Sequence, residues 1–304
     1  MTLCVAWIRR INTARELVVA TDSKLTGGGF HWIGCPKIMI FPRSDCVMCF
    51  AGETIDAYPL MLQARNAIEG HYKVRSRALD ITELVGHIGR IFNDMIRRRT
   101  LVVEKPDAKF ILAGYSWKEK DFRIYSLVYK PHDSECNNKE LVESRGRKNR
   151  AKRKNEKNDQ FVFQMHKNYH FIGDHVDMAE HQLTRKLLAR IKILSEEAGA
   201  GNSPYSLAIS SARYSLFELF DKRMRRLLRN DGCGPGKSAK KWRQIIEDVG
   251  RGELNLDYEP FEVLRDIIVN GKFSSIGGPP QLVKVYEHMN CLPYGVYWPS
   301  RKSR

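Results

Sequence analysis

The most constraining feature of the sequence is a set of short segments that would be apolar on both faces of a β-strand. They are residues 3–8, 16–21, 46–52 and 108–115. Strands of this kind need cover on both sides. Two sheets stacked face to face, with helices outside each, satisfy that requirement. The sequence therefore predicts an α+β fold, a four-layer αββα sandwich.

The order of the remaining segments is consistent with this architecture. Residues 3–8 with 16–21, and 36–41 with 46–52, are predicted to form two strand pairs before any helix. Helices follow over 54–70, with Thr54 as N-cap, and over 80–99, where Asp80 and Glu83 form a variant capping box. The later elements are strands at 108–115, 122–128 and 160–173, a helix near 175–195, a helix at 260–271, and closing strands at 281–288 and 294–299.

The positive charge is concentrated in two inserted regions. Net charge is +16, yet residues 145–157 carry eight Lys and Arg against one Glu, and residues 222–243 carry nine against one Asp. We therefore expect a single domain over 1–304, with an inserted basic loop at 131–160 and an inserted helical basic region at 198–257. Either insert could contact nucleic acid or an acidic protein, although neither resembles a known fold for reading bases.

The cysteines and the apolar runs indicate a cellular compartment. Seven cysteines are scattered without the regular framework of a secreted disulfide scaffold. The first apolar run is too short for a signal peptide, and its Arg9 and Arg10 follow it when they should precede it. No run of about 18 apolar residues indicates a membrane span. A cytoplasmic protein with no membrane association is expected.

Several motifs, taken in order, resemble the N-terminal-nucleophile hydrolases, specifically the proteasome β-subunit and HslV peptidase group. They are "TLCVAW" at the start, "VVATDSK", the lysine of "GCPKIMIF", "FAGETIDAY", "FILAGYSWKEKDFRIYSL", "FIGDH" and "IGGPPQLVKVY". The first 130 residues carry most of the likeness. The resemblance implies the αββα architecture, and a mature chain that starts with threonine at the head of the first strand.

The resemblance also implies a set of catalytic residues: Thr2, Asp22, Lys37 and Gly52. Thr2, once Met1 is removed, would be the nucleophile, with its own α-amine as base. Lys37 would favour alkoxide character on the hydroxyl, Asp22 would hold that lysine charged, and the Gly52 amide would donate to the oxyanion. The pocket for the residue before the scissile bond would be lined by Leu25, Cys35, Met39, Phe50 and Thr54.

These roles predict a threonine peptidase that forms an acyl ester on Thr2 and hydrolyses it, with a small-amide hydrolase as a variant of the same chemistry. No cofactor and no metal is expected. The resemblance further implies a peptide or protein substrate, homo-oligomeric rings, and either an ATP-dependent unfoldase or a dedicated partner protein. The alternative is a catalytically inactive scaffold subunit that binds nucleic acid or an acidic protein through the basic inserts.

Two positions depart from the family pattern. Asp174 follows the glycine of "FIGDH", where family members commonly have a serine beside the nucleophile. Near "GKFSSIGG", Phe273 and Ile276 stand where the proteasome pattern has an Asp and a Ser that support the terminus. Ser274 or Ser275 could substitute after a small shift.

Other motifs favour structural roles. "DGCGPGKS" lacks a glycine that a phosphate-binding loop needs and follows a basic helix where a strand is required. Cys46 and Cys49 form a C-x-x-C in a predicted strand, so their side chains should face opposite ways as buried thiols. His166, His170, His175 and His181 straddle a strand, a turn and a helix, which disfavours a metal site. Taken singly, Thr2, Asp22 and Lys37 could be a cleaved terminus, a turn former and a solvated charge.

Overall fold

The computed structural model describes residues 2–11, 13–27, 30–98, 106–130, 160–198 and 256–298. The helices are α1 (Thr54–Gly70), α2 (Tyr72–Arg75), α3 (Ile81–Arg97), α4 (Val176–Ala198) and α7 (Glu259–Asn270). The described strands are β1 (Leu3–Ile11), β2 (Ala14–Thr21), β3 (Leu25–Gly27), β4 (Phe30–Trp32), β5 (Ile38–Ile40), β6 (Cys46–Gly52), β7 (Ala108–Ser116), β8 (Asp121–Lys130), β9 (Gln160–His166), β10 (Tyr169–Gly173), β11 (Gln281–Tyr286) and β12 (Cys291–Tyr294). None of the described helices is long and apolar enough to span a membrane.

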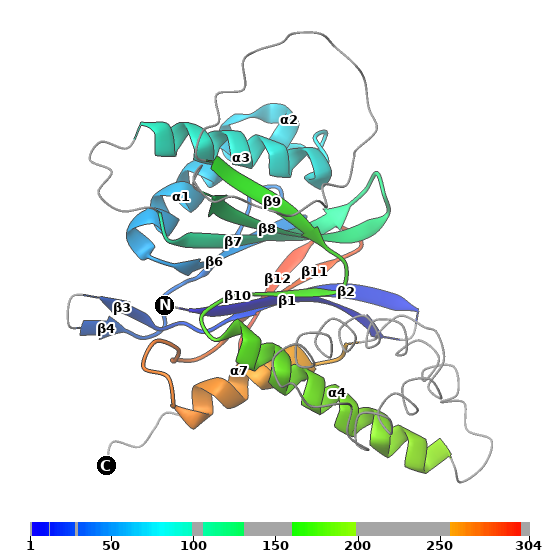
Figure 1. Cartoon of the computed structure of the whole chain (residues 1–304). Helices are drawn as coiled ribbons and strands as arrows, with labels where there is room; N and C mark the ends of the chain where they lie inside the picture. The colour runs from blue at the N-terminus through cyan, green and yellow to red at the C-terminus, as the bar shows by residue number, and fades with distance from the viewer. Residues whose placement is uncertain are drawn as a thin grey trace, which may run out of the picture.

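Two five-stranded antiparallel sheets form the centre of the molecule (Figure 1). The first has the order β10-β1-β2-β11-β12, and the second has the order β5-β6-β7-β8-β9. The strands β3 and β4 pair only with each other and project beside the start of β1 (Figure 1). The first sheet thus joins the start of the described chain to its last strands, because β2 pairs with β11.

The strand β1 shows why these sheets are buried on both faces. Leu3, Val5 and Trp7 belong to an apolar cluster that includes residues of α4 and α7. Cys4 and Ala6 point the other way, into a cluster shared with Val47, Ile111 and other residues of the second sheet. A third cluster packs α1 and α3 on the outer face of the second sheet. The fold is therefore α+β, with helices outside two facing sheets (Figure 1).

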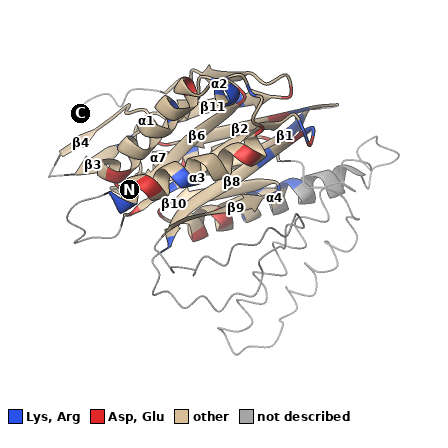
Figure 2. Ribbon diagram, turned by 90° about the horizontal axis from the view of Figure 1, so that it is seen from above, with Lys and Arg blue, Asp and Glu red and all other residues tan. Residues whose placement is uncertain are grey.

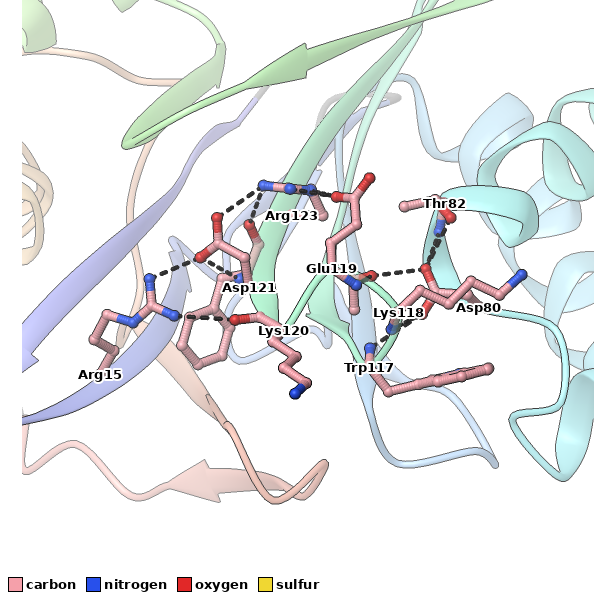
Figure 3. Close-up of polar contacts among 11 residues, drawn as sticks. Arg15, Asp80, Thr82, Trp117, Lys118, Glu119, Lys120, Asp121 and Arg123 are labelled. Atoms are coloured by element: carbon pink, nitrogen blue, oxygen red, sulfur yellow. Dashed lines mark hydrogen bonds and ion pairs between the residues drawn. The ribbon is translucent and has the colours of Figure 1, made fainter. Parts of the chain in front are cut away.

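The start of α3 is held by the predicted capping box. Asp80 accepts from the Thr82 amide at 3.0 Å, and Glu83 accepts from the Asp80 amide at 3.1 Å. Asp80 also accepts from the Ser116 hydroxyl at 2.9 Å and the Trp117 amide at 3.1 Å, which ties the helix to the β7–β8 turn (Figure 3). Burial opposes ionisation of Asp80, but these hydrogen bonds outweigh it and lower its pKa.

The charges on the described surface are of mixed sign. In Figure 2 the ribbon of α3 is coloured for both acidic and basic residues. Its sequence contains Glu83, Arg90, Asp94 and Arg97. The two basic inserts predicted at 131–160 and 198–257 fall almost wholly outside the described residues.

Four sequence expectations differ from the structure. Residues 160–173, predicted as one strand region, form β9 and β10 in different sheets, because the chain bends at residues 167–168. The described chain has six strands before α1 where four were predicted, because β3 and β4 are short, exposed and lack an alternating pattern. Thr54 is the first helical residue of α1, and Glu53 is the N-cap without a side-chain hydrogen bond. The last strand is 291–294 and not 294–299, because a turn with Met289 at φ 62° brings Cys291 back beside Val285.

Candidate functional site

Three of the predicted catalytic side chains meet at one end of the two sheets. The Lys37 Nζ atom donates to Thr2 Oγ1 at 2.6 Å and to Asp22 Oδ1 at 2.9 Å. Thr2 immediately precedes β1, Asp22 immediately follows the neighbouring β2, and Lys37 precedes β5 in the other sheet. All three are buried, with at most 1% of each residue exposed. Through its contacts with Thr2 and Asp22, Lys37 thus links the second sheet to the first.

Asp22 is held by the backbone as well as by Lys37. Its Oδ1 accepts from the Leu3 amide at 3.2 Å, and its Oδ2 accepts from the amides of Gly277 at 3.1 Å and Lys24 at 3.2 Å. Burial raises the pKa of Asp22, and the Lys37 ammonium and the backbone donors act in the opposite direction. With donors on both oxygens, the carboxylate is fixed in orientation and directs Lys37 towards Thr2.

The loop that carries Lys37 is anchored by a residue that the sequence patterns did not indicate. Gln281, at the start of β11, accepts from the Lys37 amide at 2.8 Å and donates to the Cys35 carbonyl at 2.6 Å. Gly277, which supports Asp22, was missed as well. Both lie more than 200 residues from their partners in the chain, so no local pattern could have indicated them.

Gly52, the predicted oxyanion donor, ends β6 with φ at 112°. A β-carbon there would overlap the Asp107 carbonyl oxygen, so the position requires glycine. The preceding Ala51 lies near Thr2, because a β-carbon built on Gly173 would touch both the Thr2 carbonyl and the Ala51 side chain. Gly52 therefore directly follows a residue that lies near Thr2. Donation by its amide to an oxyanion stays a prediction.

The segment opposite Thr2 is the end of β10. Leu3 pairs with Gly173, and the Asp174 amide donates to the Thr2 carbonyl at 2.9 Å. Gly173 has φ at 115°, and any side chain there would overlap the Thr2 carbonyl. Asp174 thus lies beside the backbone of Thr2, as the serine of the family pattern was expected to.

The second departure from the family pattern, at Phe273 and Ile276, places two apolar side chains in packed surroundings. Ile276 is buried in the apolar cluster beneath α4 and α7, and the Phe273 ring packs on His175 with centroids 3.8 Å apart. Their segment supports the site through its backbone, since the Gly277 amide donates to Asp22 and its carbonyl accepts from the Ser23 amide at 3.1 Å. These contacts are made without the side chains of Ser274 and Ser275.

The predicted substrate pocket has a partly apolar setting. Leu25 and Met39 are half-buried and pack against the cluster that contains the buried Phe50. Cys35 and Thr54 are half-buried. The ring of Phe50 contacts that of Tyr58, whose hydroxyl donates to the Pro36 carbonyl at 2.9 Å. Leu25, Met39 and Phe50 thus share one apolar cluster, and the role of all five predicted lining residues in substrate recognition stays a prediction.

The cysteine and histidine motifs lie among packed side chains. Cys46 and Cys49 face opposite sides of β6, as predicted, and both thiols are fully buried with their pKa raised by burial. His166 stacks on His170 with centroids 3.5 Å apart. Within the described ranges, no group of three or more His, Cys, Asp or Glu side chains is placed to hold a metal ion. The "DGCGPGKS" segment lies outside the described residues.

Comparison of the sequence with models of known protein families and with curated proteins gives no match. Function is therefore inferred from the geometry around Thr2.

Proposed function

We propose that the protein is an N-terminal-nucleophile hydrolase, a threonine peptidase of the proteasome and HslV type that acts through Thr2 after removal of Met1. The observation that carries this proposal is the chain of contacts from Asp22 through Lys37 to the Thr2 hydroxyl, at 2.9 and 2.6 Å. The two facing sheets with helices outside them are compatible with the architecture that the resemblance implies, and Thr2 immediately precedes the first strand.

The burial of this contact chain favours a chemical role over a purely structural one. Transferring a lysine and an aspartate out of water is costly, and such pairs contribute little net stability compared with apolar packing. Here the lysine also directs a proton donor at a threonine hydroxyl, the group that the reaction would ionise. Perturbed, buried ion pairs around a nucleophile are typical of catalytic sites.

The reaction follows from these contacts. The free α-amine of Thr2 takes the hydroxyl proton while Oγ1 attacks the carbonyl carbon of the scissile amide. Lys37 stabilises the developing negative charge on Oγ1, and the Gly52 amide is proposed to donate to the carbonyl oxygen. The protonated amine then gives its proton to the leaving amine as the C–N bond breaks. Water, deprotonated by the same α-amine, then attacks the carbonyl carbon of the ester on Thr2. The C–Oγ1 bond breaks, the ammonium returns its proton to Oγ1, and the second product leaves as the acid.

A peptide or protein substrate and an assembly of several copies of the chain belong to the same proposal. The apolar setting of Leu25, Met39 and Phe50 favours an apolar side chain before the scissile bond. Native mass spectrometry of the purified protein would determine the number of copies, and a strictly monomeric protein would remove the ring from the proposal.

The test combines the terminus with its reactivity. Intact-mass and N-terminal peptide analysis of the protein purified from its native host should show loss of Met1. A peptide epoxyketone, which reacts with both the hydroxyl and the amine of an N-terminal threonine, should then add once, on Thr2. Thr2→Ala should abolish the adduct, whereas Thr26→Ala, on the exposed strand β3, should leave it unchanged.

Two outcomes would overturn the proposal. One is a chain that keeps Met1 in its native host, because the Thr2 amine is then an amide. The other is a free Thr2 that forms no adduct and cleaves no peptide, which would favour the scaffold alternative and its basic inserts.

A further inference from the structure

Asp174 has a buried carboxylate oxygen that the contacts around it do not explain. Among the described residues, its Oδ2 atom is buried without a hydrogen-bond partner. The backbone amide of the same residue donates to the Thr2 carbonyl at 2.9 Å. Because the carboxylate is joined to the backbone through one methylene group, it lies in the immediate surroundings of the Thr2 backbone.

Such an oxygen needs an explanation, since leaving a buried polar atom without a partner is costly, and more so when the atom is charged. Most buried polar atoms in folded proteins therefore have a partner. Arg43 Nη1 is the other side-chain atom in this condition within the described ranges, and it belongs to an ion pair at the β5–β6 turn. Asp174 is beside the candidate nucleophile.

The backbone on both sides of Asp174 holds it in place. Gly173 has φ at 115° and His175 has φ at 56°, so left-handed residues flank the aspartate. The His175 ring packs against Phe273, and the His175 carbonyl accepts from the Ala179 amide at 3.0 Å at the start of α4. The backbone of Asp174 is thus fixed between a strand that pairs with β1 and the start of a helix.

We propose that Asp174 is a positioning residue for the mature terminus, and that its carboxylate accepts a hydrogen bond from the free α-amino group of Thr2. This inference rests on the proposed function, because only removal of Met1 creates that group. Loss of Met1 converts the Thr2 amide nitrogen, a single donor, into an amine with two donors or an ammonium with three. The new donors belong to the residue whose carbonyl accepts from the Asp174 amide, and Asp174 carries the buried oxygen without a partner.

Pairing with Asp174 would raise the pH at which the enzyme works. A carboxylate near an amine favours its charged form, so the pKa of the Thr2 amine would rise above its ordinary value of about 7.7 to 8.0. The positive charge of Lys37 would lower the pKa of the Thr2 amine, while the negative charge of Asp22 would raise it together with Asp174. The other titratable or charged groups nearby are His175 and Lys24. The free base, which the reaction needs, would then be reached at a higher pH than with the serine of the family pattern.

A structural role at the start of α4 is the competing interpretation. A carboxylate there would be stabilised by the positive end of the helix dipole. Asp177, exposed in the first turn of α4, provides the matched control because it places an equivalent charge at the same helix end without contact to Thr2.

The experiment measures the Thr2 amine directly by trace labelling with acetic anhydride between pH 5 and 10, followed by mass spectrometry of the N-terminal peptide. Asp174→Asn and Asp174→Ser should lower the midpoint of Thr2 acetylation by about one pH unit. Asp177→Asn should leave the midpoint unchanged. The acid limb of epoxyketone labelling of Thr2 should move by the same amount as the acetylation midpoint.

The outcomes separate the two proposals. Equal midpoints in the wild type, Asp174→Asn and Asp177→Asn would overturn the role of Asp174 while leaving the nucleophile intact. A shifted midpoint without any epoxyketone adduct would support the pairing and overturn the peptidase. An N-terminal peptide that still begins with Met1 would overturn both. Urea unfolding of each variant confirms that it is folded under the labelling conditions.

Discussion

The side-chain nitrogen of Lys37 lies 2.6 Å from the hydroxyl oxygen of Thr2, across the interface between the two sheets. Neither residue is in a regular strand, since Thr2 precedes β1 and Lys37 precedes β5. Their contact depends on the packing of one sheet on the other and on the carboxylate of Asp22. It also depends on the side-chain amide of Gln281, which hydrogen-bonds the backbone of Lys37 and Cys35. The chemistry and the stability of this region are therefore coupled.

Replacing Lys37 should affect both properties. Lys37→Met should lower the rate of epoxyketone labelling of Thr2 by about 100- to 1,000-fold, the usual effect of removing one stabiliser of developing charge. It should also lower the free energy of unfolding by about 3–5 kcal/mol, because Asp22 is left as an unpaired buried charge. Urea unfolding and the labelling rate measure the two effects.

A double variant separates them. Asp22→Asn combined with Lys37→Met should recover much of the lost stability, since no unpaired charge remains, but none of the labelling rate. Lys73→Met, at an exposed position in α2, is the control and should change neither. Recovery of labelling in the double variant would contradict the role of Lys37.

Substitution of the two glycines that have positive φ beside the site should distort the backbone there. Gly173→Ala forces a β-carbon against the Thr2 carbonyl, and Gly52→Ala forces one against the Asp107 carbonyl, both with φ above 110°. Each should cost at least about 2 kcal/mol of stability and most of the Thr2 labelling. Gly86→Ala in α3 meets no atom and should stabilise the protein by up to about 1 kcal/mol. Thermal unfolding gives the comparison, and equal behaviour of all three would contradict it.

The stacked histidines should make stability depend on pH. Burial and the neighbouring His166 lower the pKa of His170 to about 3, and Ser126 hydrogen-bonds His166 at 2.8 Å. A depressed pKa means that the unfolded chain binds the proton first, so this contribution is complete above about pH 6.5 and is lost as pH falls towards 3. In that window stability should fall by up to about 1.4 kcal/mol per pH unit from this group.

His170→Asn should make that slope shallower, and His31→Asn, at an exposed position in β4, should leave it unchanged. Urea unfolding at pH 7, 6, 5 and 4 measures the slopes. Identical slopes for the wild type and His170→Asn would show that another group dominates.

The buried ion pair at the β5–β6 turn should be important for folding but not for chemistry. Arg43 donates to both Asp45 oxygens, at 2.6 and 2.8 Å, and to the Leu79 carbonyl at 2.7 Å. Asp45→Asn should cost about 3–5 kcal/mol, because the guanidinium stays buried without its partner. Asp94→Asn, in an exposed pair with Arg97, should cost less than about 1 kcal/mol. A small loss for Asp45→Asn in urea unfolding would contradict this structural role.

Much of the fold could be predicted from local patterns. The two-sided apolar character of residues 3–8 and 46–52 required cover on both faces, and the structure places β1 and β6 in that way. The helical spacing and capping box of α3 were likewise readable, because they involve neighbours in sequence. The hairpin of β3 and β4 was not, since three-residue strands have too few positions to show alternation.

The sequence by itself determined the residue types of the candidate site and their order in the chain, because a threonine near the terminus, an aspartate after a strand and a lysine before another are local features. Only the tertiary structure decided that these three meet, that Gly277 and Gln281 hold them, and that the backbone amide of Asp174 donates to the Thr2 carbonyl. These contacts join residues far apart in the chain, and their geometry follows from how two sheets pack, which no local pattern encodes.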